Sequence, residues 1–187
     1  MPSIDASRIM ILSSNGFEQS ELEVPLEKLR AAGATVDVVS PESGEITGWD
    51  KKDWGRTVPV DRALKDARPG DYDALVLPGG QINPDVLRAD KDAVAFIKAF
   101  AATGKPVAAI CHAPWLLIEA GLVKGKKATS YSSIRTDMEN AGAIWEDSMT
   151  VTDGNLITAR KPDDLASFVQ AIIHAVEQEA GSRQAAE

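Results

Sequence analysis

The sequence predicts an α/β fold in which helices cover both faces of a mostly parallel, doubly wound sheet. Three observations predict it: short apolar runs typical of strands buried on both faces, amphipathic helical segments between them, and Gly- or Pro-containing turns where they meet. The 187 residues carry no repeat and no linker. We expect one domain over residues 1–187, with a core of about 8–176 and a loose tail of about 178–187 that lacks an apolar face.

The first part of the chain is predicted to form a strand, a helix and a second strand. Residues 8–12 form a continuous apolar run, and apolar positions spaced i, i+4 and i+7 from Gln19 predict a helix that ends near Gly33. The β-branched residues of 35–40 predict the next strand, with the helix as a crossover between parallel strands. Between 42 and 61 this periodicity fails, and we expect an excursion such as a hairpin.

The rest of the chain continues the alternation. Its predicted strands are 74–78, 106–110, 149–151 and 156–158. Its predicted helices are a segment that ends near Gly104, followed by 114–120, 132–140 and 165–176.

The composition excludes several classes of function. Lys and Arg number 20 against 28 Asp and Glu, a formal net charge of −8. Such a surface repels phosphate backbones and anionic lipids, so we expect neither nucleic acid nor a membrane as partner. No signal-like N-terminus and no apolar run of about 18 residues is present, which predicts a cytoplasmic protein.

Metals and cofactors are not expected either. One cysteine excludes a disulfide framework and a thiolate zinc cluster, and two histidines leave little for an imidazole site. The G-x-G-x-x-G pattern of dinucleotide-binding proteins does not follow the first strand, and no Gly-Lys step has the spacing of a phosphate-binding loop.

The most informative segment is 109–114, Ala-Ile-Cys-His-Ala-Pro, where a buried strand meets a helix. A thiol at a helix N-terminus faces unpaired N–H groups and the helix dipole, which favour the thiolate and lower the thiol pKa. Small residues two before and two after Cys111 fit the sharp turn called a nucleophile elbow. We therefore expect Cys111 to be a nucleophile, against the alternative of a small buried hydrophobic residue.

Further groups are expected beside Cys111, because the carboxyl ends of parallel strands share one edge of the sheet. His112 is the candidate base, and its backbone N–H is a candidate oxyanion donor. A second donor is expected from Gly79 or Gly80, where a Pro-Gly-Gly turn lets the backbone approach a ligand.

Two acids follow strands at the same edge. Glu18 comes after the first strand, and Asp85 after the strand of 74–78. Taken alone, each is most often a helix-start acid that the helix dipole favours.

Five motifs occur in one order along the chain. They are Leu77-Pro-Gly-Gly80, the segment 109–114, Lys127-Ala-Thr-Ser-Tyr131, Asp137-Met-Glu-Asn-Ala-Gly142-Ala and Arg160-Lys-Pro-Asp-Asp-Leu165. Together they resemble the ThiJ/PfpI superfamily, and most closely its PfpI-like branch, over about 8–176. The resemblance implies a class I glutamine amidotransferase-like fold, which is a three-layer, flavodoxin-like sandwich with the elbow at Cys111.

The resemblance also implies a role for each matching residue. Cys111 matches the nucleophile, and Glu18 matches the acid whose carboxyl group hydrogen-bonds its sulfur. His112 matches the base, and Asp85 matches an acid that reaches the histidine of a neighbouring subunit, which implies a homodimer or larger homo-oligomer. Gly80 and the His112 N–H match the oxyanion donors, and Tyr131 matches a pocket residue. Gly79 stays a candidate donor from its turn, and Trp115, which departs from the family pattern, is expected to make the binding pocket narrower and more apolar.

Two functions follow. The first is a stress-response cysteine hydrolase acting on a small molecule or peptide, either as a peptidase or as a glyoxalase or deglycase that acts on reactive aldehydes and their adducts. The second is a redox-sensing or chaperone-like protein whose Cys111 is oxidised to sulfenic or sulfinic acid. A glutaminase would need a downstream histidine with its acid, which His174 does not supply. The insertion 49–54, with two tryptophans, is expected to line the site or to pack a flap.

Overall fold

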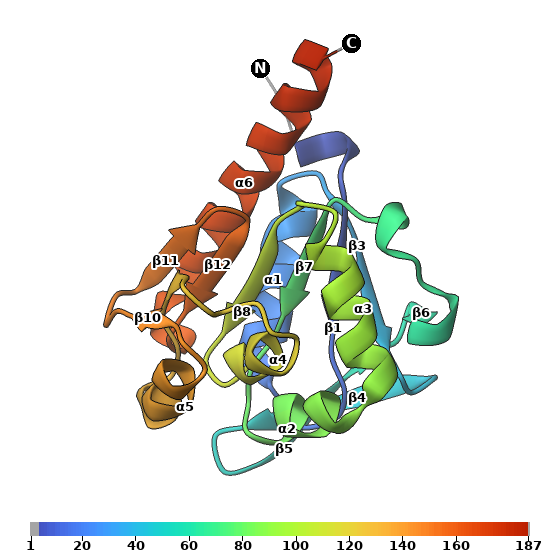
Figure 1. Cartoon of the computed structure of the whole chain (residues 1–187). Helices are drawn as coiled ribbons and strands as arrows, with labels where there is room; N and C mark the ends of the chain where they lie inside the picture. The colour runs from blue at the N-terminus through green and yellow to red at the C-terminus, as the bar shows by residue number, and fades with distance from the viewer. Residues whose placement is uncertain (1–3, 187) are drawn as a thin grey trace.

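The computed structural model describes residues 4–186 and contains the predicted three-layer α/β sandwich. Its main sheet has seven strands in the order β11-β12-β8-β7-β1-β3-β6, and helices lie on both sides of it (Figure 1). Each neighbouring pair is parallel except β11 with β12.

The seven strands of the main sheet are β1 (Arg8–Leu12), β3 (Thr35–Ser40), β6 (Arg62–Ala63), β7 (Ala74–Leu77), β8 (Val107–Ile110), β11 (Thr150–Asp153) and β12 (Leu156–Ala159). Two smaller sheets consist of β2 (Phe17–Glu18), β4 (Glu45–Asp50) and β5 (Asp53–Pro59), and of β9 (Lys127–Ala128) and β10 (Ile144–Trp145). The α-helices are α1 (Gln19–Ala31), α2 (Ile82–Ala89), α3 (Lys91–Ala101), α4 (Pro114–Glu119), α5 (Arg135–Asn140) and α6 (Leu165–Ala186). Short 3-10 turns lie at Ile4–Ala6, Leu64–Asp66, Pro69–Asp71, Ser132–Ile134 and Pro162–Asp164.

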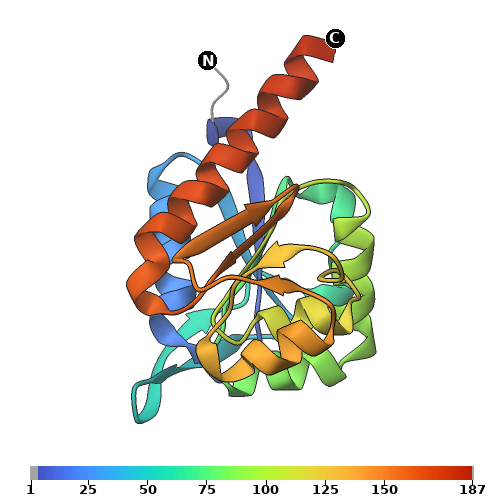
Figure 2. The same ribbon diagram turned by 60° about the vertical axis from the view of Figure 1, so that its left-hand side comes forward.

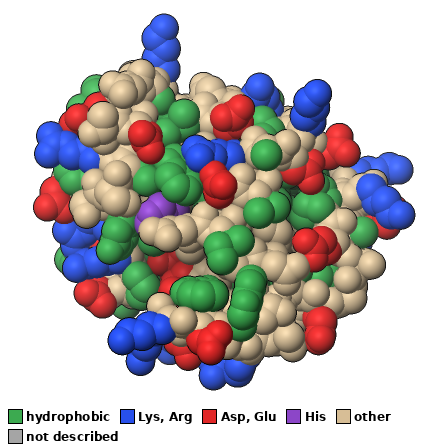
Figure 3. Space-filling model, turned by 90° about the horizontal axis from the view of Figure 1, so that it is seen from below, with side chains coloured by type: hydrophobic (Ala, Val, Ile, Leu, Met, Phe, Trp, Pro, Cys, Tyr) green, Lys and Arg blue, Asp and Glu red, His purple; other side chains and the backbone are tan. Residues whose placement is uncertain are grey.

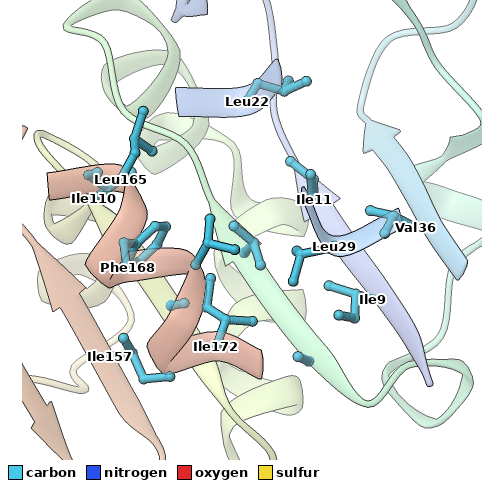
Figure 4. Close-up of a cluster of buried hydrophobic side chains, with 14 of the residues drawn as sticks. Ile9, Ile11, Leu22, Leu29, Val36, Ile110, Ile157, Leu165, Phe168 and Ile172 are labelled. Atoms are coloured by element: carbon cyan, nitrogen blue, oxygen red, sulfur yellow. The ribbon is translucent and has the colours of Figure 1, made fainter. Parts of the chain in front are cut away.

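One face of the sheet is covered by α1 and α6. Figure 4 shows Phe168 and Ile172 of α6 beside Ile157 of β12, with Leu29 of α1 over Ile9 of β1. All five of these side chains are fully buried. The apolar stripes of both helices therefore meet one continuous core, which is the arrangement predicted from the i, i+4, i+7 spacing.

The opposite face is covered by α2 to α5. Its core includes Leu87 of α2, Phe100 of α3, Leu117 of α4 and Met138 of α5, all fully buried. Because β8 is central in the sheet, all four of its residues are buried, as their uninterrupted apolar run predicts.

The predicted elements are confirmed, including the excursion of 42–61, which is the β4–β5 hairpin. Three differences remain. The short strands β2, β6, β9 and β10 are additional, and a separate helix, α2, precedes the helix expected up to Gly104. The segment 178–186 belongs to α6 and extends away from the sheet (Figure 2), where the sequence predicts a loose tail. Gln178, Glu179 and Ala180 favour a helix by intrinsic propensity, and they extend it from the packed part of α6 that nucleates it, although Gly181 alone would not.

No helix in the described part of the chain is both long and apolar enough to cross a membrane.

The parallel topology places the loops after β1, β7 and β8 at one edge of the sheet. The loop after β1 is linked to α2 by Asn83, whose Oδ1 accepts a hydrogen bond from the Ser14 N–H at 2.7 Å. The same side chain donates to the Pro78 carbonyl at 3.0 Å. This buried amide ties two of the three loops together, and their tips form the candidate site.

Candidate active site

Cys111 lies in the turn between β8 and α4 and has an unusual backbone conformation. Its φ is +64°, a region that L-residues other than Gly seldom adopt. The side chain is 6% exposed and forms part of the wall of a cavity of about 450 Å³. A strained, nearly buried thiol that faces a cavity is an arrangement found at functional sites, where the surrounding structure maintains the strain.

Backbone N–H groups surround the sulfur. Those of Gly80 and His112 both stabilise its negative form and so oppose the rise in its pKa. Gly80 has φ +85°, and a Cβ there would lie 2.6 Å from the Glu18 nitrogen, so only glycine fits. The Gly79 N–H is not available to a ligand, because it donates to Glu21 Oε2 at 2.8 Å.

The carboxyl group beside the sulfur is that of Glu21, which corrects the expectation for Glu18. Glu21 is fully buried in the first turn of α1, and its carboxyl interacts with the Cys111 thiol. Glu18 also lines the cavity, but its Oε1 accepts a hydrogen bond from the Ser20 hydroxyl at 3.3 Å. The reason is helical geometry: residue 18 precedes the helix, whereas residue 21 shares the buried face of α1 with Pro25 and Leu29.

Burial is the main cause of the raised pKa values of Glu21 and Cys111. Burial, and then the charge of Glu18, raise the pKa of Glu21 to about 8. Burial, and then the charge of Glu21, also raise the pKa of the Cys111 thiol. The expected lowering of the thiol pKa at the helix N-terminus is therefore wrong for this resting state, because desolvation and a neighbouring acid outweigh the N–H groups.

His112 is 4% exposed and contacts the sulfur directly. Its Nδ1 lies 3.2 Å from Cys111 Sγ, and its Nε2 lies 3.2 Å from Ser133 Oγ. The ring stacks on Tyr131 at 4.9 Å between centroids and meets the edge of Trp115 at 5.1 Å. Burial lowers the His112 pKa, so the neutral imidazole is favoured as a proton acceptor.

Asp85 does not reach His112 within the chain. It lies on the exposed side of α2, and its Oδ1 pairs with the Arg88 guanidinium at 2.6 Å. Arg88 in turn stacks over the Trp115 ring, 4.3 Å from its centroid. The expected contact from Asp85 to a second subunit stays a prediction.

The remaining predicted residues divide between the cavity and its support. Tyr131, 38% exposed, lines the cavity, and so does Trp49 of the hairpin. Trp115 does not line it, in contrast to the prediction: its ring packs behind His112, and its Nε1 donates to Asp137 Oδ2 at 2.8 Å. Figure 3 shows this face of the molecule, where a histidine is recessed among hydrophobic and acidic side chains.

Similarity to known proteins identifies the family of this chain. The model of the DJ-1/PfpI family matches residues 7–175. The chain belongs to the DJ-1/PfpI family. "Deglycase TK1284" of Thermococcus kodakarensis is 45% identical over 166 residues, 89% of this chain and 97% of that protein. "General stress protein 18" of Bacillus subtilis is 43% identical over 162 residues, 86% of this chain and 92% of that one.

The fold comparison agrees with this membership of the DJ-1/PfpI family. A crystal structure of a two-domain protein from Anabaena variabilis, with DJ-1/ThiJ/PfpI-like and ferritin-like domains, has a TM-score of 0.85 and 38% identity. The match covers 90% of this chain and 48% of that chain, so this chain spans about half of that protein.

Two residues at the site of this DJ-1/PfpI member, Glu21 and Ser133, are not predicted from the sequence. Glu21 is an acid on the apolar stripe of a helix, four residues before the buried Pro25, and that position is a usable signal of a buried carboxyl. Ser133 has no comparable signal, because a serine at the start of a predicted helix is ordinary.

Proposed function

We propose that the protein is a cysteine-dependent deglycase that removes adducts of reactive aldehydes such as methylglyoxal. The observation that carries the proposal is the placement of one thiol in a cavity wall with an imidazole nitrogen 3.2 Å away and two backbone N–H groups around it. The 45% identity to a protein named deglycase supports this branch, and a 43% identical protein named "Putative cysteine protease YraA" keeps the peptidase as the alternative that the test must separate.

Each group has a task in this reaction. The Cys111 thiol passes its proton to His112 Nδ1, and the thiolate adds to the electrophilic carbon of the adduct. The oxygen on that carbon gains negative charge, which the N–H groups of Gly80 and His112 stabilise. His112 then returns the proton to the departing amine or thiol, and the aldehyde-derived fragment stays bonded to the Cys111 sulfur. Water then breaks this carbon–sulfur bond, which releases the fragment as the hydrated aldehyde and restores the Cys111 thiol. Glu21, neutral near pH 7, keeps a second negative charge away from the thiolate.

The test uses preformed adducts, so that consumption of free aldehyde is not mistaken for deglycation. Purified adducts of methylglyoxal with N-acetylarginine and N-acetylcysteine are incubated with wild type, Cys111→Ala and Cys111→Ser, beside a peptide panel. We expect release of the free amino acid by wild type only. Equal release by wild type and Cys111→Ala would refute the proposal, and activity only on peptides would select the peptidase.

The second candidate is a redox-responsive protein. A protonated Glu21 can donate a hydrogen bond to an oxidised sulfur, because its pKa is about 8. The 43% identity to a protein named general stress protein supports this reading. One hydrogen peroxide would oxidise the Cys111 thiol to sulfenic acid, and a second would oxidise that to sulfinic acid; each peroxide is reduced to water. Glu21→Gln should change the yield of sulfinic acid measured by mass spectrometry, whereas the matched control Glu18→Gln should not.

A homodimer or larger assembly, in which Asp85 approaches His112 of a second copy, is part of this proposal, as is a cytoplasmic location. Mixed dimers of Asp85→Ala and Cys111→Ser protomers test the first. Restored activity would support a shared site, and no rescue in a verified mixed dimer would argue against it. Cell fractionation tests the location.

A further inference from the structure

The Nε2 atom of His112 already has a partner within the chain. Ser133 Oγ lies 3.2 Å from it, while Nδ1 faces Cys111 Sγ at the same distance on the other side of the ring. Packing against the Tyr131 and Trp115 rings limits rotation of the imidazole. The ring is therefore held in one orientation, with the thiol on one nitrogen and a hydroxyl on the other.

The segment that carries Ser133 is tied to the same turn as Cys111. The Tyr131 N–H donates to the Cys111 carbonyl at 2.9 Å, and the Ile134 N–H donates to the Tyr131 carbonyl at 3.1 Å. Ile134 is 2% exposed, which anchors the 3-10 turn in the core. The hydroxyl is thus fixed relative to the sulfur by backbone hydrogen bonds.

We propose that Ser133 is the positioning residue of His112, a hydroxyl that accepts the Nε2–H hydrogen bond and so presents the Nδ1 lone pair to the Cys111 thiol. The thiol proton moves to Nδ1, which leaves a thiolate and an imidazolium. In the imidazolium both nitrogens carry hydrogen, and Ser133 Oγ still accepts from Nε2. The proton balance closes within these three side chains, and Ser133 itself neither gains nor loses charge.

A neutral hydroxyl defines the tautomer without adding a negative charge near Glu21 and Glu18. Because Ser133 is exposed to solvent, its own hydrogen is free to donate outward to water. His112 then has a partner for each ring nitrogen within the chain.

Only the effect of Ser133 on the rate of deglycation rests on the proposed function. The first test measures the tautomer of His112 and needs no enzymatic turnover. The ¹⁵N chemical shifts of imidazole nitrogens report the tautomer, and the chain has two histidines, so His174→Gln assigns the His112 signals. We expect the Nε2–H tautomer in wild type, Ser133→Thr and the control Ser132→Ala. In Ser133→Ala this preference should be lost. An Nδ1–H tautomer in wild type, or unchanged shifts in Ser133→Ala, would overturn the proposal.

The second readout is the rate at which iodoacetamide alkylates Cys111 at pH 7. Ser133→Ala should slow it about tenfold, the size expected when a hydrogen bond to a charged group is lost and water partly replaces it. Ser133→Thr should restore the rate, which a merely structural defect would not show. If Asp85→Ala alters the His112 shifts or the rate as much as Ser133→Ala, the partner of Nε2 is the acid and the proposal fails. Deglycation that survives in Cys111→Ala would refute the proposed function and leave these two readouts unaffected.

Discussion

The Glu21 carboxyl should make folding stability fall as the pH rises, and Glu21→Gln should remove that dependence. Glu21 is fully buried, and its pKa rises from an ordinary 4.5 to about 8 in the folded protein. Between these values the unfolded chain has lost the proton that the folded chain still binds. Stability is therefore full below the unfolded pKa and is lost as the pH rises through the folded one.

The size of the effect follows from the two pKa values. Because the Glu21 pKa rises from 4.5 to about 8 on folding, the protein loses about 5 kcal/mol of folding stability between low pH and a pH well above 8. Each unit of pKa difference contributes about 1.36 kcal/mol. Between pH 5 and pH 8 the wild type should lose about 3 kcal/mol from this group. Glutamine keeps an oxygen for the Gly79 N–H and cannot ionise, so the variant should lose nothing from this position.

Urea unfolding followed by tryptophan fluorescence measures the difference. Wild type, Glu21→Gln and the control Glu18→Gln are compared at pH 5, 6, 7 and 8, so that contributions from all other groups cancel. Glu18→Gln should retain the steep fall with pH, because it leaves Glu21 in place. If the curves of wild type and Glu21→Gln run parallel, the carboxyl is ionised in the folded protein and the reasoning is refuted.

Three substitutions test the backbone around the site, each by urea unfolding. Gly80→Ala should destabilise by at least about 2 kcal/mol, because its Cβ would lie 2.6 Å from backbone atoms; a neutral result would contradict the φ of +85°. Cys111→Gly should be about 1 kcal/mol more stable than Cys111→Ala, since glycine relieves the strain at φ +64°, and the reverse order would argue against that strain. Asn83→Ala should cost about 2–3 kcal/mol, because buried groups of Ser14 and Pro78 lose their partner; a change below about 0.5 kcal/mol would show that water replaces the amide.

Most of the fold can be predicted from the sequence, because period and burial are local signals. The apolar run of 106–110 predicts a strand buried on both faces, and β8 (Val107–Ile110) is an interior strand of the sheet, between β12 and β7. The helix α2 is missed as a separate element because it has only eight residues and contains Pro84. The end of α6 is missed because an apolar face predicts packing, whereas propensity alone extends this helix beyond the core.

The candidate site is predicted less completely, because its chemistry depends on what surrounds each group. The position of Cys111 follows from a local pattern, the strand-to-helix turn between small residues. Which of two acids contacts its sulfur depends on one turn of helix geometry, and the direction of the thiol pKa depends on burial, which no local pattern gives. The serine beside His112 comes from a segment 21 residues away.

The central claim is that small molecules reach the Cys111 sulfur through the cavity while the protein stays folded. Iodoacetamide labelling, followed by intact mass at several urea concentrations below the unfolding transition, tests it directly because the chain has one cysteine. We predict one adduct per chain, formed at a rate that these urea concentrations leave unchanged. A rate that rises in step with the unfolded fraction would mean that the thiol reacts only after unfolding, which contradicts the claim.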